Sequence, residues 1–354
     1  MGSLKRLIIY SMTKKILFIT NDFLDARISR IPLIRFIQAR NECLDIKICT
    51  CLDDSRTNHD ELFYIGKRSD YIGNIKKLSK LKKKFDFDLI ISRGIEYSII
   101  CGIIWFNTRK VFLLTGLGRV FGHKNLIISA IFKSAYILLL KMLKPKEIIV
   151  QNPDDHKELC KLSPKIVLGS GIIENKITKP FSRNSNKIIF VIASRLTKAK
   201  GIIQLIEGFL LACDEAPNIY LKLYGDLFLG KDDYDLFNSI VNQNVNIEYF
   251  GHIDSVDNQI QQADFVVYPT LYREGVPRFL IQALYFGKPI ISTDMPGARE
   301  CFDKNGILIN SKLLTKNSIK AAILEIIKME YSVLALKSKN LYISKFATAK
   351  IYRE

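Results

Sequence analysis

Two basic residues and one acid are candidates for binding a diphosphate and the groups beside it: Arg195, Lys200 and Glu274. Arg195 and Lys200 stand five residues apart, at the turn between an expected strand over 187–193 and an expected helix that begins after residue 201. An arginine can grip phosphate oxygens with two donors, and a lysine adds a point charge. Ordinary surface charge is the alternative for both residues. Their position at a strand-to-helix turn favours a site for a diphosphate.

Glu274 belongs to a second segment, residues 265–292, that predicts a strand, a loop, a helix and a strand. Pro277 stands where a helix begins, because a residue without an N–H loses nothing in the first turn. Gly287 stands where a left-handed residue ends it, and the apolar residues between them recur at helical spacing. Glu274 is therefore expected just outside a helix N-terminus, which is an anion-binding geometry. Its carboxylate suits the hydroxyls beside a phosphate, and a sugar diphosphate has both groups.

A longer set of residues in this segment resembles the donor-sugar site of glycosyltransferase family 4. The set is Glu274-Gly275-x-Pro277, Gln282, Gly287-Lys288-Pro289 and Pro296-Gly297-x-Arg299-Glu300. In that family a Glu, seven residues, Glu motif binds the nucleotide sugar. The first Glu matches Glu274, but the second falls on Gln282, whose amide oxygen accepts from one ribose hydroxyl where a carboxylate accepts from two. The alternative is that Gln282 is only a half-buried helix residue.

The resemblance implies an α/β chain with the GT-B fold, two Rossmann-like parallel-sheet domains that face each other across a cleft. The expected parts are an acceptor-binding domain over 1–170 with an extension at 1–14, a linker over 171–186, a nucleotide-sugar-binding domain over 187–340, and a terminal helix over 341–354 that packs back on the first domain. Transfer is expected to retain the anomeric configuration and to need no metal. No cofactor is expected, since the nucleotide sugar is a substrate.

The same resemblance assigns residues in the second domain. Glu274, Arg195 and Lys200 are the expected catalytic residues. The expected donor-binding residues are Gln282, Gly275, Val276, Pro277, Arg278, Tyr272, Gly225 and Asp226.

The first domain supplies the expected acceptor site. Arg30 opens a helix after the strand 15–20, in a loop without glycine, and resembles an arginine that one subgroup of the family keeps there; the alternative is a solvated residue at a helix start. Residues 115–123 carry three glycines after another strand, which marks backbone that something approaches closely. This loop resembles the Gly-Leu-Gly loop of transferases that act on lipid-diphosphate-linked sugars. The expected acceptor-facing residues in it are Gly116, Gly118, Arg119 and His123.

The net charge limits the classes of partner that this chain could bind. Lys and Arg exceed Asp and Glu by 18 in the 354 residues, and residues 1–185 hold 33 basic and 17 acidic residues. Such a surface suits nucleic acid, an anionic membrane or a phosphorylated substrate. The chain lacks a nucleic-acid-binding signature, which disfavours the first. The lysine-rich helix expected over 70–85 is either a solvated face or attracted to acidic lipid headgroups.

Several features favour a cytoplasmic protein that lies on the inner face of the membrane. No uncharged apolar run reaches the ~20 residues of a membrane span, and the apolar core of residues 1–14 is too short for a signal peptide. The seven scattered cysteines are expected to be reduced and buried. The apolar helix expected over 125–143 is either buried in the domain or lies among headgroups with its lysines reaching out, and burial is the favoured interpretation.

The resemblance predicts a transferase that moves a hexose or an N-acetylhexosamine from a nucleotide sugar, a UDP-sugar in our expectation, to a sugar on undecaprenyl diphosphate. That reaction belongs to O-antigen, capsule or other surface-polysaccharide synthesis. Two alternatives stay open, a GT-B nucleotide-sugar 2-epimerase and a non-catalytic partner subunit that resembles a glycosyltransferase. Gln282 and the glycine-free first loop motivate the second alternative. A Gln282→Glu variant would separate a decayed donor site from a working one.

Overall fold

The computed structural model describes residues 14–20, 23, 26–41, 43–51, 62–67, 69–121, 126–175 and 186–354. Contacts within the chain divide it into two compact units. Unit 1 comprises Met1–Ile173 and Thr348–Glu354, and unit 2 comprises Glu174–Ala347. The expected extension lies outside the described residues except for Lys14, and so do residues 176–185 of the expected linker.

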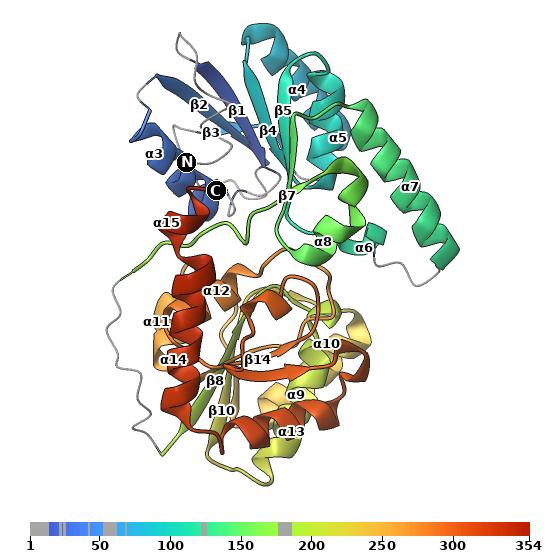
Figure 1. Cartoon of the computed structure of the whole chain (residues 1–354). Coiled ribbons are helices and arrows are strands. Elements are labelled where there is room, and N and C mark those ends of the chain that lie inside the picture. Colours follow the sequence, from blue (N-terminus) through green and yellow to red (C-terminus); the bar gives the residue numbers. More distant parts are fainter. Residues whose placement is uncertain are drawn as a thin grey trace. The chain divides into compact units, whose positions relative to one another are not determined.

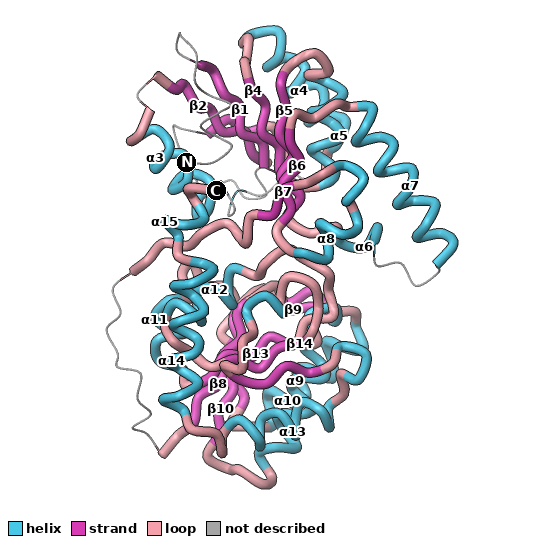
Figure 2. Tube along the Cα trace, in the orientation of Figure 1, coloured by secondary structure: helices cyan, strands magenta, loops and turns pink. Residues whose placement is uncertain are grey.

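Unit 1 is built on a parallel sheet, which has seven strands in the described residues, in the order β3-β2-β1-β4-β5-β6-β7 (Figure 2). The strands are β1 (Lys14–Thr20), β2 (Leu44–Thr50), β3 (Leu62–Tyr64), β4 (Leu89–Arg93), β5 (Arg109–Leu114), β6 (Glu147–Val150) and β7 (Lys165–Ile166). The central strands are short apolar runs that are buried along most of their length. That pattern is typical of a parallel sheet covered on both faces.

Helices cover both faces of this sheet (Figure 1). The π-helical turn Ala26–Arg30 and α3 (Ile31–Gln38) pack on one face with the side chains of Phe18 and Ile91. The other face carries α4 (Tyr71–Lys84), α5 (Ile95–Ile104), the short α6 (Gly118–Phe121), α7 (Leu126–Met142) and α8 (Pro153–Glu158). Asp70 caps α4 by accepting from the Gly73 N–H at 2.9 Å, as the sequence position of an acidic N-cap predicts.

The favoured interpretation of α7 as a buried helix is wrong for half of its surface. Tyr136, Leu140 and Leu143 are buried against β5 and β6, but Ile131 and Leu138 are among the exposed large apolar residues. A helix that is apolar all round gives no periodic signal for its inward face. The sequence therefore could not show which side of α7 is exposed.

Unit 2 is built on a second parallel sheet, with six strands in the order β12-β10-β8-β13-β14-β15. They are β8 (Ile188–Ala193), β10 (Ile219–Tyr224), β12 (Ile247–Tyr249), β13 (Phe265–Tyr268), β14 (Ile290–Thr293) and β15 (Gly306–Ile309). A small parallel pair, β9 (Leu196–Thr197) and β11 (Leu227–Phe228), lies beyond the ends of β8 and β10. The two sheets confirm the expected pair of parallel-sheet α/β domains.

The helices of unit 2 also form a layer on each face of the sheet (Figure 1). One layer holds α9 (Ile202–Cys213), α10 (Lys231–Gln243) and α13 (Lys316–Ile326), and the other holds α11 (Asp257–Gln262), α12 (Arg278–Tyr285) and α14 (Tyr331–Leu341). Gly208 lets α9 and α13 approach, because a Cβ there would lie 2.5 Å from the Lys316 carbonyl oxygen. The sequence-predicted helix after Pro277 is α12, and Gly287 has the left-handed φ of 63° that the expected helix end requires.

Two sequence expectations need correction. The chain from 341 onward is not one terminal helix: α14 ends at Leu341, the π-helical turn Tyr342–Phe346 follows, and a last turn, α15 (Thr348–Ile351), groups with unit 1. In that unit the Thr348 hydroxyl donates to the Ile172 carbonyl at 2.9 Å. All seven cysteines are free, but Cys43 and Cys160 are exposed rather than buried.

Within the described residues, no helix is both long and apolar enough to cross a membrane.

Candidate active site

The candidate site of unit 2 lies where the direction of its strand order reverses. Strand β8 has β10 on one side and β13 on the other, so the chain builds the sheet outward in both directions from β8. In open α/β sheets, ligands bind beyond the carboxyl ends of the strands at such a point. The loop after β8 contains Arg195 and Lys200, and the loop after β13 contains Glu274. The topology therefore brings the three sequence-predicted catalytic residues to one crevice.

Glycines hold these loops against one another. A Cβ at Gly201 would lie 2.2 Å from the Pro269 carbonyl oxygen, and one at Gly297 would lie 2.0 Å from the Gly275 carbonyl oxygen. The Leu271 N–H also donates to the Ala199 carbonyl at 2.8 Å. The backbone after β8, β13 and β14 is thus in direct contact. A shift of any one loop would move the others.

Lys200 and Glu274 form an ion pair at this edge of the sheet. The Lys200 ammonium donates to Glu274 Oε1, and that oxygen also accepts from the hydroxyls of Tyr268 at 3.0 Å and Thr270 at 3.4 Å. The two charged side chains are only 11% and 20% exposed. An ion pair this sheltered from water is stronger than a surface pair, and both of its charges are held in place. The arrangement positions one cation and one carboxylate where a ligand would enter.

Burial shifts the pKa values of Lys200 and Tyr268. Desolvation lowers the pKa of Lys200 below 10.5, the neighbouring Arg195 lowers it further, and Glu274 opposes both effects. Burial and then the charge of Glu274 raise the pKa of Tyr268 well above 10.0, so its hydroxyl stays a donor. Arg195 itself is exposed. Arg195 and Lys200 repel each other, and an anionic ligand between them would relieve that repulsion. A diphosphate is an anion that could do so.

The remaining loops of this edge carry the other donor-site candidates. Gly225 has a φ of 121°, and a Cβ there would lie 1.8 Å from the Ser194 carbonyl oxygen, so this position needs glycine. Asp226 next to it is exposed, and its carboxylate lies 3.5 Å from Nδ1 of His252. The loop after β10 therefore borders the loop that carries Arg195. An exposed carboxylate there is available to ribose or base hydrogen-bond donors.

The amino end of α12 completes the site. Pro277 occupies its N-cap and provides no side-chain cap, while Gly275 and Val276 before it are buried. Arg278 is the first helical residue and is half-buried. The ring centroid of the half-buried Tyr272 lies 5.8 Å from the Lys200 ammonium. The helix end thus lies directly after the loop of Glu274, as the sequence predicts.

Gln282 lies in a different environment from the one its motif position suggests. It is 7% exposed, and its Nε2 donates to Asp257 Oδ1 at 2.7 Å. Asp257, at the start of α11, also accepts from the Asn175 side chain. A carboxylate at 282 would place two acids together with little water. An amide at position 282 can donate a hydrogen bond to the Asp257 carboxylate, whereas an ionised carboxylate there could not.

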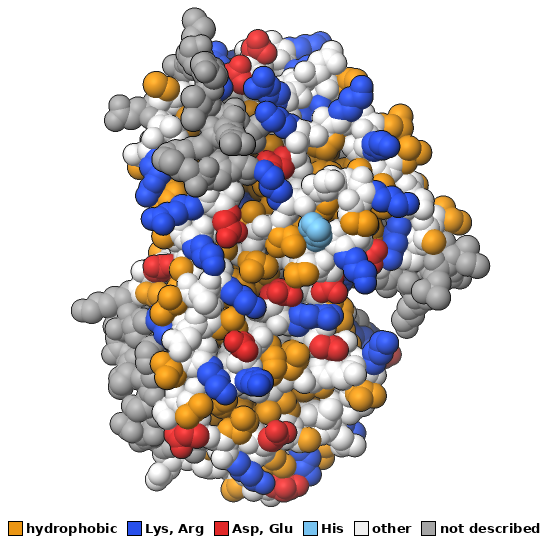
Figure 3. Space-filling model, viewed as in Figure 1, with side chains coloured by type: hydrophobic (Ala, Val, Ile, Leu, Met, Phe, Trp, Pro, Cys, Tyr) orange, Lys and Arg blue, Asp and Glu red, His pale blue; other side chains and the backbone are white. Residues whose placement is uncertain are grey.

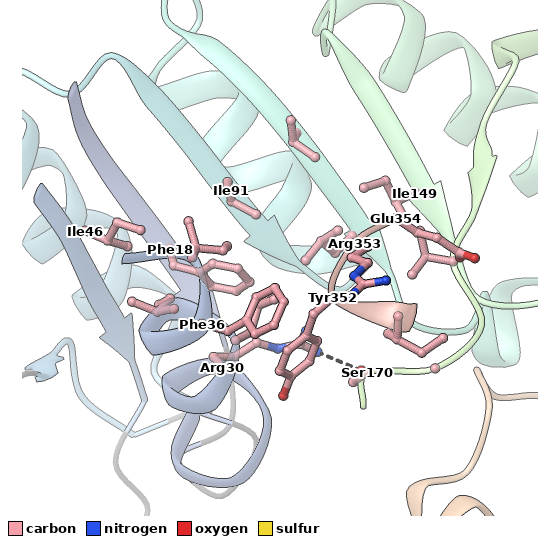
Figure 4. A pocket seen from close by; sticks show the side chains of 18 of the residues that line it. Phe18, Arg30, Phe36, Ile46, Ile91, Ile149, Ser170, Tyr352, Arg353 and Glu354 are labelled. Atoms are coloured by element: carbon pink, nitrogen blue, oxygen red, sulfur yellow. Dashed lines mark hydrogen bonds between the residues drawn. The ribbon is translucent and has the colours of Figure 1, made fainter. Parts of the chain in front are cut away.

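Arg30 in unit 1 is not the solvated residue of the alternative interpretation, because it is 3% exposed. Its Nη2 donates to the Ser170 hydroxyl at 3.2 Å, and Gln151 donates to the same hydroxyl at 2.9 Å. These residues line a cavity of about 460 Å³ over the sheet face beside α3, which Phe18, Phe36 and the C-terminal Tyr352 also line (Figure 4). The cavity is mainly apolar, and its charged lining residues are Arg30, Arg40, Arg353 and Glu354. Arg30 is thus one of the few charges in an apolar pocket.

The glycine-rich loop after β5 has the backbone that the sequence indicates. Gly116 and Gly118 have φ values of 114° and 55°, and Leu117 between them is fully buried. The side chain of Arg119 and the whole of His123 lie outside what the structure describes.

Three residues of the unit 2 site escaped the sequence analysis. Tyr268 and Thr270 donate to Glu274, and Asp257 accepts from Gln282. Tyr268 ends β13 and Thr270 follows it by two residues, so their position at the carboxyl edge was a usable signal. Asp257 is 25 residues from Gln282, and no local pattern connects them.

Among the described residues, no three His, Cys, Asp or Glu side chains gather in a way that could hold a metal ion.

Comparison with known proteins gives the site its context. Residues 174–343, almost all of unit 2, match the family model of the glycosyl transferases group 1. The structure of HepE from Anabaena, solved with UDP and glucose, aligns with a TM-score of 0.74 over 97% of this chain and 98% of its own, at 15% identity. These findings show the GT-B fold for this chain and a likeness of unit 2 to the glycosyl transferases group 1.

Sequence relatives agree with that assignment over shorter stretches. An uncharacterized glycosyltransferase of Methanocaldococcus jannaschii is 26% identical over 245 residues, 63% of this chain and 60% of its own length. The capsular polysaccharide biosynthesis glycosyltransferase CapM of Staphylococcus aureus is 29% identical over 130 residues, 35% of this chain and 33% of its own. The matches thus span less than two thirds of these relatives. At 15% identity the likeness to HepE supports the GT-B fold of this chain but not its substrates.

Proposed function

We propose that this chain is a retaining glycosyltransferase of family 4 that moves a hexose or an N-acetylhexosamine from a nucleotide sugar to a sugar on undecaprenyl diphosphate. The observation that carries the proposal is the sheltered pair of Lys200 and Glu274, with Arg195 beside it, at the reversal point of the unit 2 sheet. A cation pair for a diphosphate and a carboxylate for hydroxyls together match the two halves of a nucleotide sugar.

A UDP-sugar is the proposed donor. HepE was solved in complex with UDP and glucose. A TarM variant from S. aureus, which aligns with a TM-score of 0.64 at 17% identity, was solved in complex with UDP and α-GlcNAc-glycerol, and the alignment covers 79% of this chain and 57% of TarM. We propose uridine among the nucleotides because UDP is the nucleotide bound in both of these structures. The sugar depends on the loops of this chain.

The proposed reaction breaks the bond between the anomeric carbon and the diphosphate oxygen and forms a bond from that carbon to an acceptor hydroxyl oxygen on the same face. Arg195 and Lys200 stabilise the negative charge on the leaving diphosphate. The acceptor proton passes to that leaving group, which serves as the base. When the diphosphate takes Lys200, Glu274 is released to hold the sugar hydroxyls, so the anomeric carbon faces the acceptor.

The acceptor and the location follow from charge and from one relative. Unit 1 carries nearly all of the positive excess of the chain, which suits a diphosphate-linked substrate at the anionic inner face of the cytoplasmic membrane. Arg30, Gly116, Gly118, Arg119 and His123 are the proposed acceptor-site residues. The likeness to CapM supports a role in the synthesis of capsule, O-antigen or another surface polysaccharide.

Turnover of UDP-, GDP- and dTDP-sugars with extracted lipid-diphosphate sugars tests the proposal, with Glu274→Ala as the comparison variant and chelator present in a parallel series. We expect product from one class of donor, no loss in chelator and a rate at least ~10²-fold lower from the variant. Product whose anomeric configuration is inverted would contradict the retaining reaction.

The non-catalytic partner subunit is the second candidate, and Gln282 in place of the motif carboxylate favours it. It predicts nucleotide binding without turnover of any donor. A 2-epimerase would instead change the nucleotide sugar itself when no acceptor is present, which the same assay detects.

A further inference from the structure

Helix α7 of unit 1 presents an apolar stripe to solvent. Ile131, Leu138 and Met142 are 62%, 59% and 60% exposed, and their spacing of seven and four residues places them on one side of the helix. Phe132 beside them is also exposed. The opposite side is the one that packs on the sheet, where Tyr136 meets Phe121 edge to face at 5.8 Å. A soluble monomer rarely leaves such a continuous stripe uncovered.

The end of α5, which lies beside the end of α7, also carries exposed apolar residues. Gly102 packs so closely on α7 that a Cβ there would lie 2.7 Å from Leu143 Cδ1. Ile103 and Phe106, which follow Gly102, are both exposed. We call the exposed apolar residues of α7 and of the neighbouring α5 end the α7 face: Ile103, Phe106, Ile131, Phe132, Leu138 and Met142.

Lysines border the α7 face. Lys141, Lys144 and Lys146 at the end of α7 are exposed, and α7 contains no Asp or Glu. The nearby acids are engaged, since Glu158 pairs with Lys133 and Glu147 pairs with Lys165.

The end of α4 adds more positive charge. Lys82 donates to the Ile104 carbonyl, which brings the exposed run Lys82-Lys83-Lys84 to the end of α5. Blue and orange side chains lie next to one another along the α7 edge of unit 1, at the right of Figure 3.

We propose that the α7 face docks on an anionic phospholipid surface, with its apolar side chains among the lipids and its lysines at the phosphates. Helices that lie in a membrane interface combine an apolar side with a lysine-rich border in this way. A second copy of this chain is a poor occupant, because a two-fold contact would set these lysines against themselves. The inference rests on the proposed function for its purpose, since a lipid-linked acceptor lies in a membrane.

The position of α7 fits that purpose. The helix is preceded by α6 and the Gly116–Gly118 turn, and Phe121 of α6 packs against Tyr136 of α7. A helix lying along the lipid surface would therefore hold the proposed acceptor loop near the headgroups. The proposed donor-site residues lie in unit 2, so loss of membrane binding should leave them intact.

Flotation of the full chain with vesicles tests the proposal. The apolar variant is Ile131→Gln, Leu138→Gln, Met142→Gln, and its matched control is Val333→Gln, Leu336→Gln, Ile343→Gln, which changes three exposed apolar residues of unit 2. We expect the wild type to float with phosphatidylglycerol vesicles, the apolar variant to lose at least about tenfold in affinity, and the control to bind as wild type.

Charge reversal provides the second arm. Lys141→Glu, Lys144→Glu, Lys146→Glu should lose roughly fivefold per lysine, whereas Lys231→Glu, Lys304→Glu, Lys312→Glu in unit 2 should bind as wild type. Phosphatidylcholine vesicles should bind every form weakly. Because all substituted residues are exposed, melting temperatures should stay close to that of the wild type.

The outcomes separate this inference from the proposed function. A wild type that does not float, or an α7 variant that floats as well as its control, overturns the inference. So does a wild-type dimer that the apolar variant disperses, since a second copy would then be the occupant. Vesicle binding that follows the expected pattern in a chain that transfers no sugar upholds the inference and contradicts the proposed transferase.

Discussion

In unit 1 the strand order reverses between β1 and β4, and in unit 2 it reverses between β8 and β13, so the two sheets offer the same kind of ligand crevice. Their contents differ. The crevice of unit 2 holds the sheltered pair of Lys200 and Glu274. The corresponding part of unit 1 has Arg30 bound to Ser170 beside an apolar cavity. One topology thus carries two kinds of chemistry, which reside in the loops rather than in the sheet.

The difference extends to how the loops are held. In unit 2, Gly201, Gly225 and Gly297 bring backbone against backbone at the carboxyl edge. In unit 1, Gly171 packs against a side chain, that of Tyr352 in the C-terminal turn. Backbone contacts leave little room for adjustment, whereas a side chain can move. The rigid carboxyl edge of unit 2 suits the proposed nucleotide sugar, which has a defined geometry. The more adjustable edge of unit 1 suits the proposed acceptor substrate, which has an apolar tail.

Removal of either member of the unit 2 pair should have the largest effect. Lys200→Ala and Glu274→Ala are each expected to lower kcat/KM by on the order of 10²–10³, because each removes a fixed charge at the reacting groups. Initial rates with the preferred donor measure this. Lys198→Ala is the matched control, since Lys198 is exposed and pairs with Asp233. An equal loss in the control would show that general positive charge, rather than the pair, binds the donor.

The rigidity of the unit 2 edge can be tested at glycines. Gly297→Ala places a methyl group 2.0 Å from the Gly275 carbonyl oxygen and 2.6 Å from that of Glu274. Displacement of Glu274 by about 1 Å should cost up to ~10²-fold in rate. Gly251→Ala is the control for φ alone, because its φ is 70° but a Cβ would meet nothing within 4 Å.

Thermal unfolding and initial rates separate the two contributions. Gly251→Ala should lose only the ~1–2 kcal/mol of a left-handed conformation, with little change in rate. Gly230→Ala, where a Cβ also meets nothing within 4 Å, should change neither quantity. If Gly297→Ala behaves like Gly251→Ala, then close packing does not position Glu274.

Gln282→Glu should destabilise unit 2 rather than improve it. The new carboxylate would face Asp257 at a site that is 7% exposed, so the free energy of unfolding should fall by about 1–3 kcal/mol at neutral pH. Asp257→Asn combined with Gln282→Glu should recover most of that loss. A large gain in activity for Gln282→Glu alone would contradict this and indicate that residue 282 contacts the donor.

Much of unit 2 could be predicted because its signals are local. Pro277 and Gly287 bound α12 as expected, and short apolar runs gave β8, β13 and β14 within two residues of their ends. Lys200 and Glu274 could be assigned to one site because both follow strands, and the carboxyl ends of parallel strands share an edge. Their catalytic roles stay predictions until rates are measured.

The contacts that the sequence could not supply join distant residues. Arg30 meets Ser170 across 140 residues, and Gln282 meets Asp257 through the packing of α11 on α12. The outward side of α7 was equally hidden, because its apolar residues lie all round the helix. Each depends on which elements pack together, and that is a property of the whole fold rather than of a local pattern.

The smallest expected effect is on the pH dependence of stability. It comes from two lysines, one in each unit, whose pKa values are lowered below 10.5 by burial. Lys110 in unit 1 donates to the carbonyls of Trp105, Phe106 and Thr108 at the end of α5, whereas Lys200 pairs with Glu274. Between each lowered pKa and 10.5 the unfolded chain binds more protons than the folded chain. Both lysines should therefore make stability rise with pH in that window.

Donor binding should distinguish the two lysines. A bound diphosphate should require Lys200 to be protonated, whereas the protonation of Lys110 should not matter. The affinity for UDP should fall as pH rises through the lowered pKa of Lys200. Since Glu274 raises that pKa, Glu274→Gln should start the fall at a lower pH. Lys110→Met should leave the pH profile of UDP binding unchanged while it removes part of the pH dependence of unfolding. Calorimetric titrations with UDP between neutral and alkaline pH measure the profiles, and an unshifted profile in Glu274→Gln would mean that Lys200 does not bind the diphosphate.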